Sequence, residues 1–115
     1  MTDRLSVKLK LLELICYRAD EGDGDEVFLK QNGRKVWPED QKYLKISEGI
    51  VKVNLALDVE LGSQVILELW DYDVLSSNDK LGEFRMLADQ RGAEFTTDLH
   101  EGKSRAKYSL KWELS

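Results

Sequence analysis

The chain has 115 residues, a length that fits one domain with a two-layer core, and we expect a single domain over residues 1–115. With 42% hydrophobic residues, 34% charged residues and one proline, the composition is typical of a globular protein and excludes disordered and fibrous classes. The net charge of -5 excludes the broad positive surface of a nucleic-acid-binding protein, so no nucleic-acid partner is expected.

The first 18 residues carry too many charges and too short an apolar run for a signal peptide or a membrane span. Cys16 is the only cysteine, which excludes a disulfide framework and predicts a small buried side chain. These features fit a reducing compartment, and we expect a cytoplasmic protein that can lie at the periphery of a membrane.

The first strand-like run changes phase in its middle. Its apolar positions are Val7, Leu9 and Leu11, followed by Leu12, Leu14 and Cys16. This change predicts either a β-bulge or a strand that is buried on both faces. Further along, Asn32-Gly33 predicts a two-residue hairpin turn, because both residues tolerate positive φ.

Three later segments, 51–57, 65–69 and 106–114, alternate apolar and polar residues as half-buried strands do. Between and around them, residues 43–46 and 80–86 read as further strands, and residues 88–92 as a loop or a brief helical turn. The count of seven or eight strands with frequent turns predicts an all-β antiparallel sandwich or small barrel.

An acidic stretch, LWDYDVLSSNDKLG, covers residues 69–82. Asp71 is in phase with the apolar side of the preceding strand, and Asp73 shares that side. A buried carboxylate is costly unless it is neutralised. A five-residue excursion then brings Asp79 back toward the first two carboxylates, and calcium prefers such sets of oxygen ligands.

A second acidic loop joins the first strand to the hairpin. It contains Asp20, Glu21, Asp23, Asp25 and Glu26. Loops that are far apart in sequence gather at one end of a Greek-key sandwich. If these two loops share an end, about five carboxylates converge there and repel one another in the absence of a cation.

The stretch from Leu67 to Gly82 resembles the third calcium-binding loop of C2 domains, and residues 25–28 resemble the start of the strand after their first loop. The resemblance spans nearly the whole chain and implies an antiparallel eight-stranded Greek-key β-sandwich. It also implies that calcium (Ca2+) is the cofactor. The residues that it makes metal ligands are Asp71, Asp73 and Asp79 from one loop and Asp25 and Asp20 from the other. The first loop is one residue shorter than the common form, which leaves Asp23 as an alternative to Asp20.

The C2 resemblance makes Val74 and Leu75 a membrane-inserting tip; the alternative is that Leu75 folds back over its loop. The expected function is a non-catalytic calcium-binding module that docks to an anionic membrane surface or to a protein partner. The alternative is a metal-free interaction domain that uses the acidic loops as a protein contact. An enzyme is not expected, because His100 is the only histidine and no nucleophile motif is present.

Seven basic residues on the strands also offer two interpretations. They are Lys8, Lys10, Arg34, Lys35, Lys42, Lys45 and Lys52. They form either a basic sheet face that meets phosphoinositides or a protein, or an ordinary solvated face.

Overall fold

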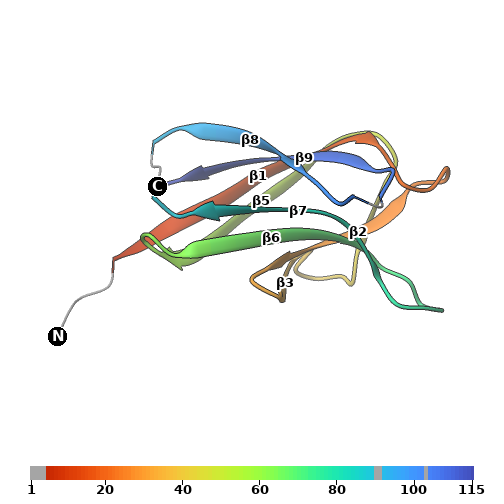
Figure 1. Ribbon diagram of the computed structural model, residues 1–115, viewed down its shortest axis with the longest axis horizontal. Helices are drawn as coiled ribbons and strands as arrows, with labels where there is room; N and C mark the ends of the chain where they lie inside the picture. The colour runs from red at the N-terminus through yellow and green to blue at the C-terminus, as the bar shows by residue number, and fades with distance from the viewer. Residues whose placement is uncertain (1–4, 90–91, 103) are drawn as a thin grey trace.

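The computed structural model describes residues 5–89, 92–102 and 104–115, which form two packed antiparallel sheets (Figure 1). Within these ranges the strands are β1 (Ser6–Arg18), β2 (Asp25–Gln31), β3 (Arg34–Trp37), β4 (Leu44–Ile46), β5 (Gly49–Glu60), β6 (Gln64–Asp71), β7 (Asp79–Leu87), β8 (Glu94–Leu99) and β9 (Lys107–Leu114). One sheet has the order β5-β1-β9-β8. The other has the order β3-β2-β6-β7, with β4 also paired to β2. The all-β class is therefore confirmed.

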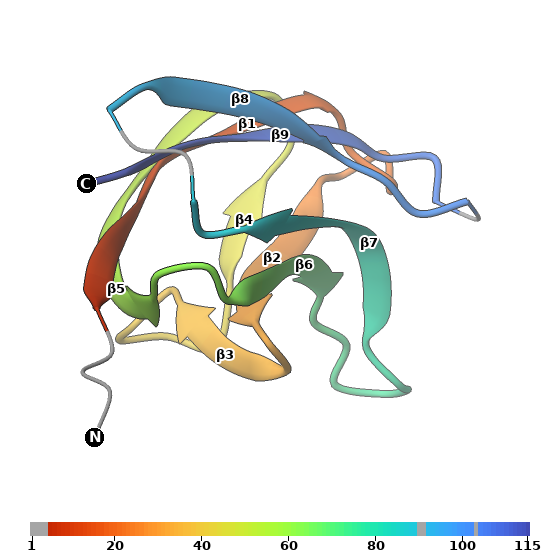
Figure 2. The same cartoon turned by 60° about the vertical axis from the view of Figure 1, so that its left-hand side comes forward.

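Strands β3 and β4 follow one another along the same edge of β2. β3 pairs with residues 29–31 of β2, whereas β4 pairs with residues 25–27. Each sheet thus has four strand positions, so the nine strands of the described residues build the expected eight-stranded sandwich (Figure 2). The neighbours β1 and β9, and β2 and β6, are far apart in sequence, as Greek-key connections require.

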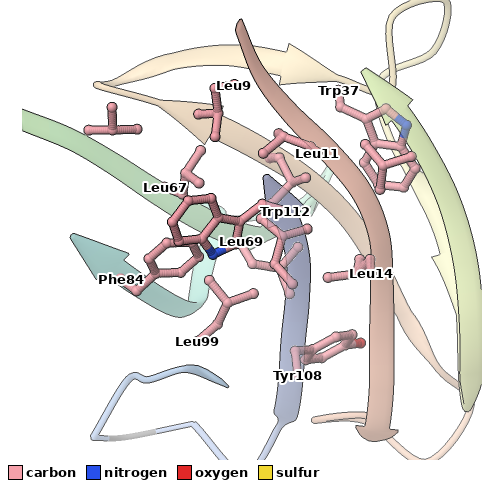
Figure 3. Close-up of a cluster of buried hydrophobic side chains, with 14 of the residues drawn as sticks. Leu9, Leu11, Leu14, Trp37, Leu67, Leu69, Phe84, Leu99, Tyr108 and Trp112 are labelled. Carbon is pink, nitrogen blue, oxygen red and sulfur yellow. The ribbon is translucent and has the colours of Figure 1, made fainter. Parts of the chain in front are cut away.

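The core lies between the two sheets and follows the alternation of the sequence. Leu9 and Leu14 of β1, Leu69 of β6 and Leu110 of β9 have no exposed surface. Trp112 stacks between the rings of Phe84 and Phe95, with centroid separations of 6.2 and 4.7 Å. Figure 3 shows Leu9, Leu14, Leu69, Phe84 and Trp112 within this cluster. Burial of each large apolar side chain contributes about 1.5–3 kcal/mol.

The change of phase in β1 is a bulge, as predicted. The pairing of β1 with both β5 and β9 shifts between Leu11 and Glu13, so Leu12 interrupts both ladders. The hairpin prediction is also confirmed, because Asn32 and Gly33 connect β2 to β3 with φ values of 48° and 85°. These signals are local, which is why the sequence revealed them.

Strand β8 is missing from the predicted elements. Only Phe95 and Leu99 of its six residues are large apolar residues, because it is an edge strand on which only Leu99 is buried. The segment expected to be a loop or helical turn forms a turn at Ala88 and Asp89, and its residues 90–91 lie outside the described residues.

The β1–β2, β6–β7 and β8–β9 connections lie together at one end of the sandwich, opposite the end where β1 begins and β9 finishes (Figure 1). The prediction that the two acidic loops share an end is therefore confirmed. We call this end the acidic end. No helix in the described ranges is long and apolar enough to cross a membrane.

Candidate functional site

Asp71 and Asp79 face one another where β6 ends and β7 begins. They are directly paired across the two strands. This pairing depends on a bulge, because the register shifts after Leu69 and leaves Leu81 of β7 without a partner on β6. If the ladder were regular, Lys80 would lie opposite Asp71. The bulge therefore places two carboxylates, rather than an ion pair, at the end of the sheet.

The Asp71 carboxylate is nearly buried, with 8% of the residue exposed. Its Oδ1 accepts a hydrogen bond of 2.9 Å from the backbone N–H of Glu26, which links the end of β6 to the start of β2. Burial, together with the negative charges of Asp25, Glu21 and Glu26, raises the pKa of Asp71 from 3.8 to about 6. The hydrogen bond only partly opposes this rise. The ionised form is thus destabilised in the folded protein.

Asp25 is fully buried beneath the first acidic loop. Its Oδ2 accepts hydrogen bonds from the Tyr108 hydroxyl at 2.7 Å and the Asp20 backbone N–H at 2.8 Å. Its Oδ1 accepts one from the Glu21 N–H at 3.2 Å. Because a carboxylate oxygen has two lone pairs, Oδ1 keeps the capacity to bind one further partner. Asp25 therefore organises this loop from below.

Tyr108 is a contributor to the site that the sequence did not indicate. Burial raises the pKa of its hydroxyl, and contacts with Cys16 and Asp25 add to the effect. The phenol therefore stays protonated and donates to Asp25. The two residues lie 83 positions apart, so no local pattern connects them.

The other acidic residues of the first loop lie nearer the surface. Asp20 Oδ1 accepts hydrogen bonds from the Arg105 N–H at 2.9 Å and from the Ser104 hydroxyl at 3.4 Å, which ties this loop to the β8–β9 connection. Asp23 is exposed. Partial desolvation, followed by the charges of Asp23, Asp25, Asp20 and then Asp73, raises the pKa of Glu21. The carboxylates of the two loops therefore lie within electrostatic reach of one another.

Asp73 shapes the β6–β7 loop, residues 72–78. Its Oδ2 accepts a hydrogen bond from the Ser76 hydroxyl at 2.7 Å and its Oδ1 accepts one from the Leu75 N–H at 2.8 Å; these bonds hold its pKa below the usual value. The turn leaves Val74 77% exposed and Leu75 94% exposed. The alternative in which Leu75 folds back over the loop is therefore wrong.

Solved structures share this arrangement of strands over nearly the whole chain. A C2 domain of plant extended synaptotagmin 1 has a TM-score of 0.58 and 13% identity, over 96% of this chain and 93% of that one. Another C2 domain has a TM-score of 0.56 and 11% identity, over 98% and 99% of the two chains. The chain has the C2 fold. The fold that the sequence resemblance implied is therefore confirmed.

Human GIVD cytosolic phospholipase A2 contains the same fold as one part of a larger chain. Its TM-score is 0.55 with 15% identity, over 99% of this chain but only 17% of that one. No protein-family model matches the sequence, and no curated protein matches it. At these identities the C2 likeness concerns the fold.

The acidic end of this C2 fold has the donor chemistry of a site for a hard cation, since calcium is held by carboxylate and carbonyl oxygens. In the described residues, no group of three or more His, Cys, Asp or Glu side chains stands in a metal-holding arrangement. Asp71 and Asp79 are the carboxylates that the strands pair directly. Each oxygen of Asp73 accepts one hydrogen bond and keeps a lone pair, as does Oδ1 of Asp25. These free lone pairs belong to the oxygen type that calcium prefers, and both calcium binding and the assignment of each ligand stay predictions.

The basic residues of β1 and β5 belong to a solvated, ion-paired face. Lys8 pairs with Asp58, and Lys52 lies 3.1 Å from Glu13. Lys10 lies 3.7 Å from Glu113. In the β3–β4 connection, Lys42 instead lies over the ring of Tyr72. For the β1 and β5 lysines the structure favours the solvated-face interpretation.

Proposed function

We propose that this chain is a non-catalytic docking module that binds calcium at its acidic end and attaches to an anionic phospholipid surface. The observation that carries the proposal is the β6–β7 loop. This loop lies between Asp71 and Asp79, which β6 and β7 pair directly, and it presents Val74 and Leu75 to solvent at its tip. One loop therefore combines oxygen ligands for a cation with apolar contacts for a lipid interface.

The carboxylates explain why binding would depend on calcium. Without a cation, the negative charges at the acidic end repel one another and also repel an anionic surface; the charges of Asp25, Glu21 and Glu26 add to the effect of burial on the pKa of Asp71. A bound calcium ion supplies positive charge that offsets both repulsions. Asp71, Asp79 and Asp73 would hold it from one loop, with Asp25 and either Asp20 or Asp23 from the other.

The loop tip supplies the apolar part of the interaction. Val74 and Leu75 have 77% and 94% of their surface in water, so entry into the interface removes apolar area from solvent. Full burial of side chains of this kind contributes about 1.5–3 kcal/mol each. A contribution of this size from two side chains suits reversible attachment of the protein to a membrane.

The proposal is tested by two measurements on three double variants. Calorimetric titration measures calcium binding, and sedimentation with phosphatidylserine-containing vesicles measures docking. We expect Asp71→Asn/Asp79→Asn to abolish both, and Val74→Ser/Leu75→Ser to abolish only docking. Leu5→Ser/Leu87→Ser is the control, because these residues are also exposed, at 61% and 55%, and lie just before the start of β1 and at the end of β7, away from the acidic end.

Calcium binding weaker than millimolar, with a melting temperature that is unchanged by chelator, would contradict the metal part of the proposal, since a ligand of the folded state stabilises it. Calcium binding without calcium-dependent sedimentation would contradict the membrane part and favour a protein partner.

One observation favours the metal-free alternative. The carboxylates of Asp25 and Asp73 both accept hydrogen bonds on each oxygen from within the protein, so the loops have a defined shape without an ion. An interaction domain that uses the acidic end as a protein contact is therefore the second candidate. The calcium titration separates it from the first.

A further inference from the structure

A hollow of about 510 Å³ lies beside the acidic end, between the end of β1 and the β8–β9 connection. Three basic residues line it: Arg18, Arg105 and Lys107. Tyr17, which is 54% exposed, lines it as well. The hollow therefore brings three cationic side chains together next to the acidic end, along with the carboxylates of Asp98 and Glu101.

The strand register places like charges together here. Arg18 of β1 is directly paired with Lys107 of β9. Elsewhere in β1, each charged residue that faces a charged partner faces the opposite sign, as Lys8 does with Asp58 and as Glu13 does with Lys52. Like charges directly opposite each other destabilise a sheet. The pair at the end of β1 thus departs from the pattern of its own strand.

The three basic residues also have no ion-pair partner in the described part of the chain. Their side chains are without a carboxylate oxygen within 4.0 Å, whereas Lys8, Lys10, Lys52, Lys80, Arg85 and Lys111 each have one. In the described residues, no direct ion pair therefore neutralises these three side chains.

Two acidic residues that line the hollow are already engaged. Asp98 accepts a hydrogen bond from the Ser109 hydroxyl, and Glu101 lies 3.8 Å from the ammonium group of Lys80. Asp98 keeps its negative charge, since the hydroxyl is neutral, and Glu101 shares the single Lys80 ammonium with Glu68 and Glu83. Neither carboxylate forms an ion pair with Arg18, Arg105 or Lys107, so the guanidinium and ammonium groups stay open to an external anion.

Arg18 is held in place for such an anion. Its Nε donates a hydrogen bond of 2.8 Å to the backbone carbonyl of Arg105, which fixes the guanidinium plane. The four N–H groups on the two Nη atoms remain, and they match the geometry of a phosphate. We propose that this hollow binds the phosphate of an anionic phospholipid headgroup. That the phosphate belongs to a membrane lipid rests on the proposed function.

The position of the hollow supports a bilayer as the partner. The β8–β9 connection that forms one of its walls lies at the same end of the sandwich as the β6–β7 loop (Figure 1). A single bilayer surface can therefore contact both Val74 and Leu75, which follow a strand of one sheet, and Arg18, which belongs to the other sheet. Tyr17 adds an aromatic side chain with a polar tip, a type that is enriched at membrane interfaces.

The first experiment is an NMR titration in chelator, so that it does not depend on calcium. Glycerophosphoserine, which carries the headgroup without acyl chains, and inorganic phosphate are added separately. We expect glycerophosphoserine to shift the backbone amides of residues 17–18 and 104–107. No shift at these amides, or equal shifts at the ion-paired lysines of β1 and β5, would overturn the proposal. A shift with inorganic phosphate alone would overturn the assignment to a headgroup.

The second experiment measures vesicle binding of two variants with the same change in net charge. Arg18→Gln/Lys107→Gln removes two unpaired charges, and Lys8→Gln/Lys52→Gln removes two that are paired to carboxylates. A basic residue at an anionic surface contributes a factor of about five in affinity. We therefore expect the first variant to lose about 25-fold and the control to lose less than about twofold.

Equal losses in the two variants would show a general effect of net charge and overturn the proposal. Failure of the calcium proposal is recognised separately, because neither variant changes a predicted calcium ligand and the headgroup titration contains no calcium.

Discussion

Replacement of Asp71 by asparagine tests the electrostatic argument most directly. The carboxylate is nearly buried, and its pKa is raised from 3.8 to about 6, so the folded state binds a proton more tightly than the unfolded state. The resulting loss of stability is absent below about pH 4 and complete above about pH 7. A change of one pKa unit corresponds to about 1.36 kcal/mol, so the ionised carboxylate lowers the free energy of unfolding by at most about 3 kcal/mol.

Asparagine keeps an oxygen that can accept the Glu26 N–H but carries no charge. In chelator at pH 7.5, Asp71→Asn should raise the free energy of unfolding by about 1–3 kcal/mol, whereas at pH 4 it should change little. Urea denaturation followed by tryptophan fluorescence at both pH values measures this. Asp79→Asn is the control, because Asp79 is exposed and its substitution should change stability by less than about 0.5 kcal/mol.

An Asp71→Asn variant that is no more stable than wild type at pH 7.5, or that shows the same dependence on pH, would refute this reasoning. The expected gain in stability accompanies the loss of calcium binding predicted above. The wild-type residue would then be one that lowers stability in exchange for function.

Three further substitutions test the fold, each by urea denaturation. Gly82→Ala should destabilise by about 1–3 kcal/mol or more, because its Cβ would lie 2.7 Å from the backbone carbonyl of Leu99; an unchanged midpoint would contradict this close approach. Tyr108→Phe should cost about 1–3 kcal/mol by removing a hydrogen bond to the buried carboxylate of Asp25, and a neutral result would mean that water replaces the hydroxyl. Leu110→Ala should cost about 2–5 kcal/mol, since the side chain is fully buried, and a cost below about 1 kcal/mol would place it outside the core.

Much of the fold could be predicted from the sequence because its signals are local. Alternation over 106–114 corresponds to β9, whose residues Tyr108, Leu110, Trp112 and Leu114 are buried. Ser109 is an exception. The alternation predicts this residue on the polar face, but it has no exposed surface, and its hydroxyl donates to Asp98 on the neighbouring strand. A two-residue period indicates on which side of a strand a residue lies, but it does not indicate whether another part of the protein covers that side.

The candidate site was predictable where it lies within one loop and not where it depends on pairing across the fold. The spacing from Asp71 to Asp79 indicated that the two would meet, and the strands do pair them. The link from Asp20 to the β8–β9 connection spans 85 residues and leaves no trace in local sequence. The like-charged pair of Arg18 and Lys107 is also invisible without the register.

The bulge at Leu81 makes the charge at the end of the second sheet a property of the backbone register rather than of the composition. The same residues in a regular ladder would place Lys80 opposite Asp71, so a slip of one position would replace a pair of like charges by an internal ion pair. That end would then carry less negative charge to attract a cation, although no aspartate had been lost. In this chain, the register of two strands therefore decides whether the same set of residues presents paired aspartates or an ion pair at that end.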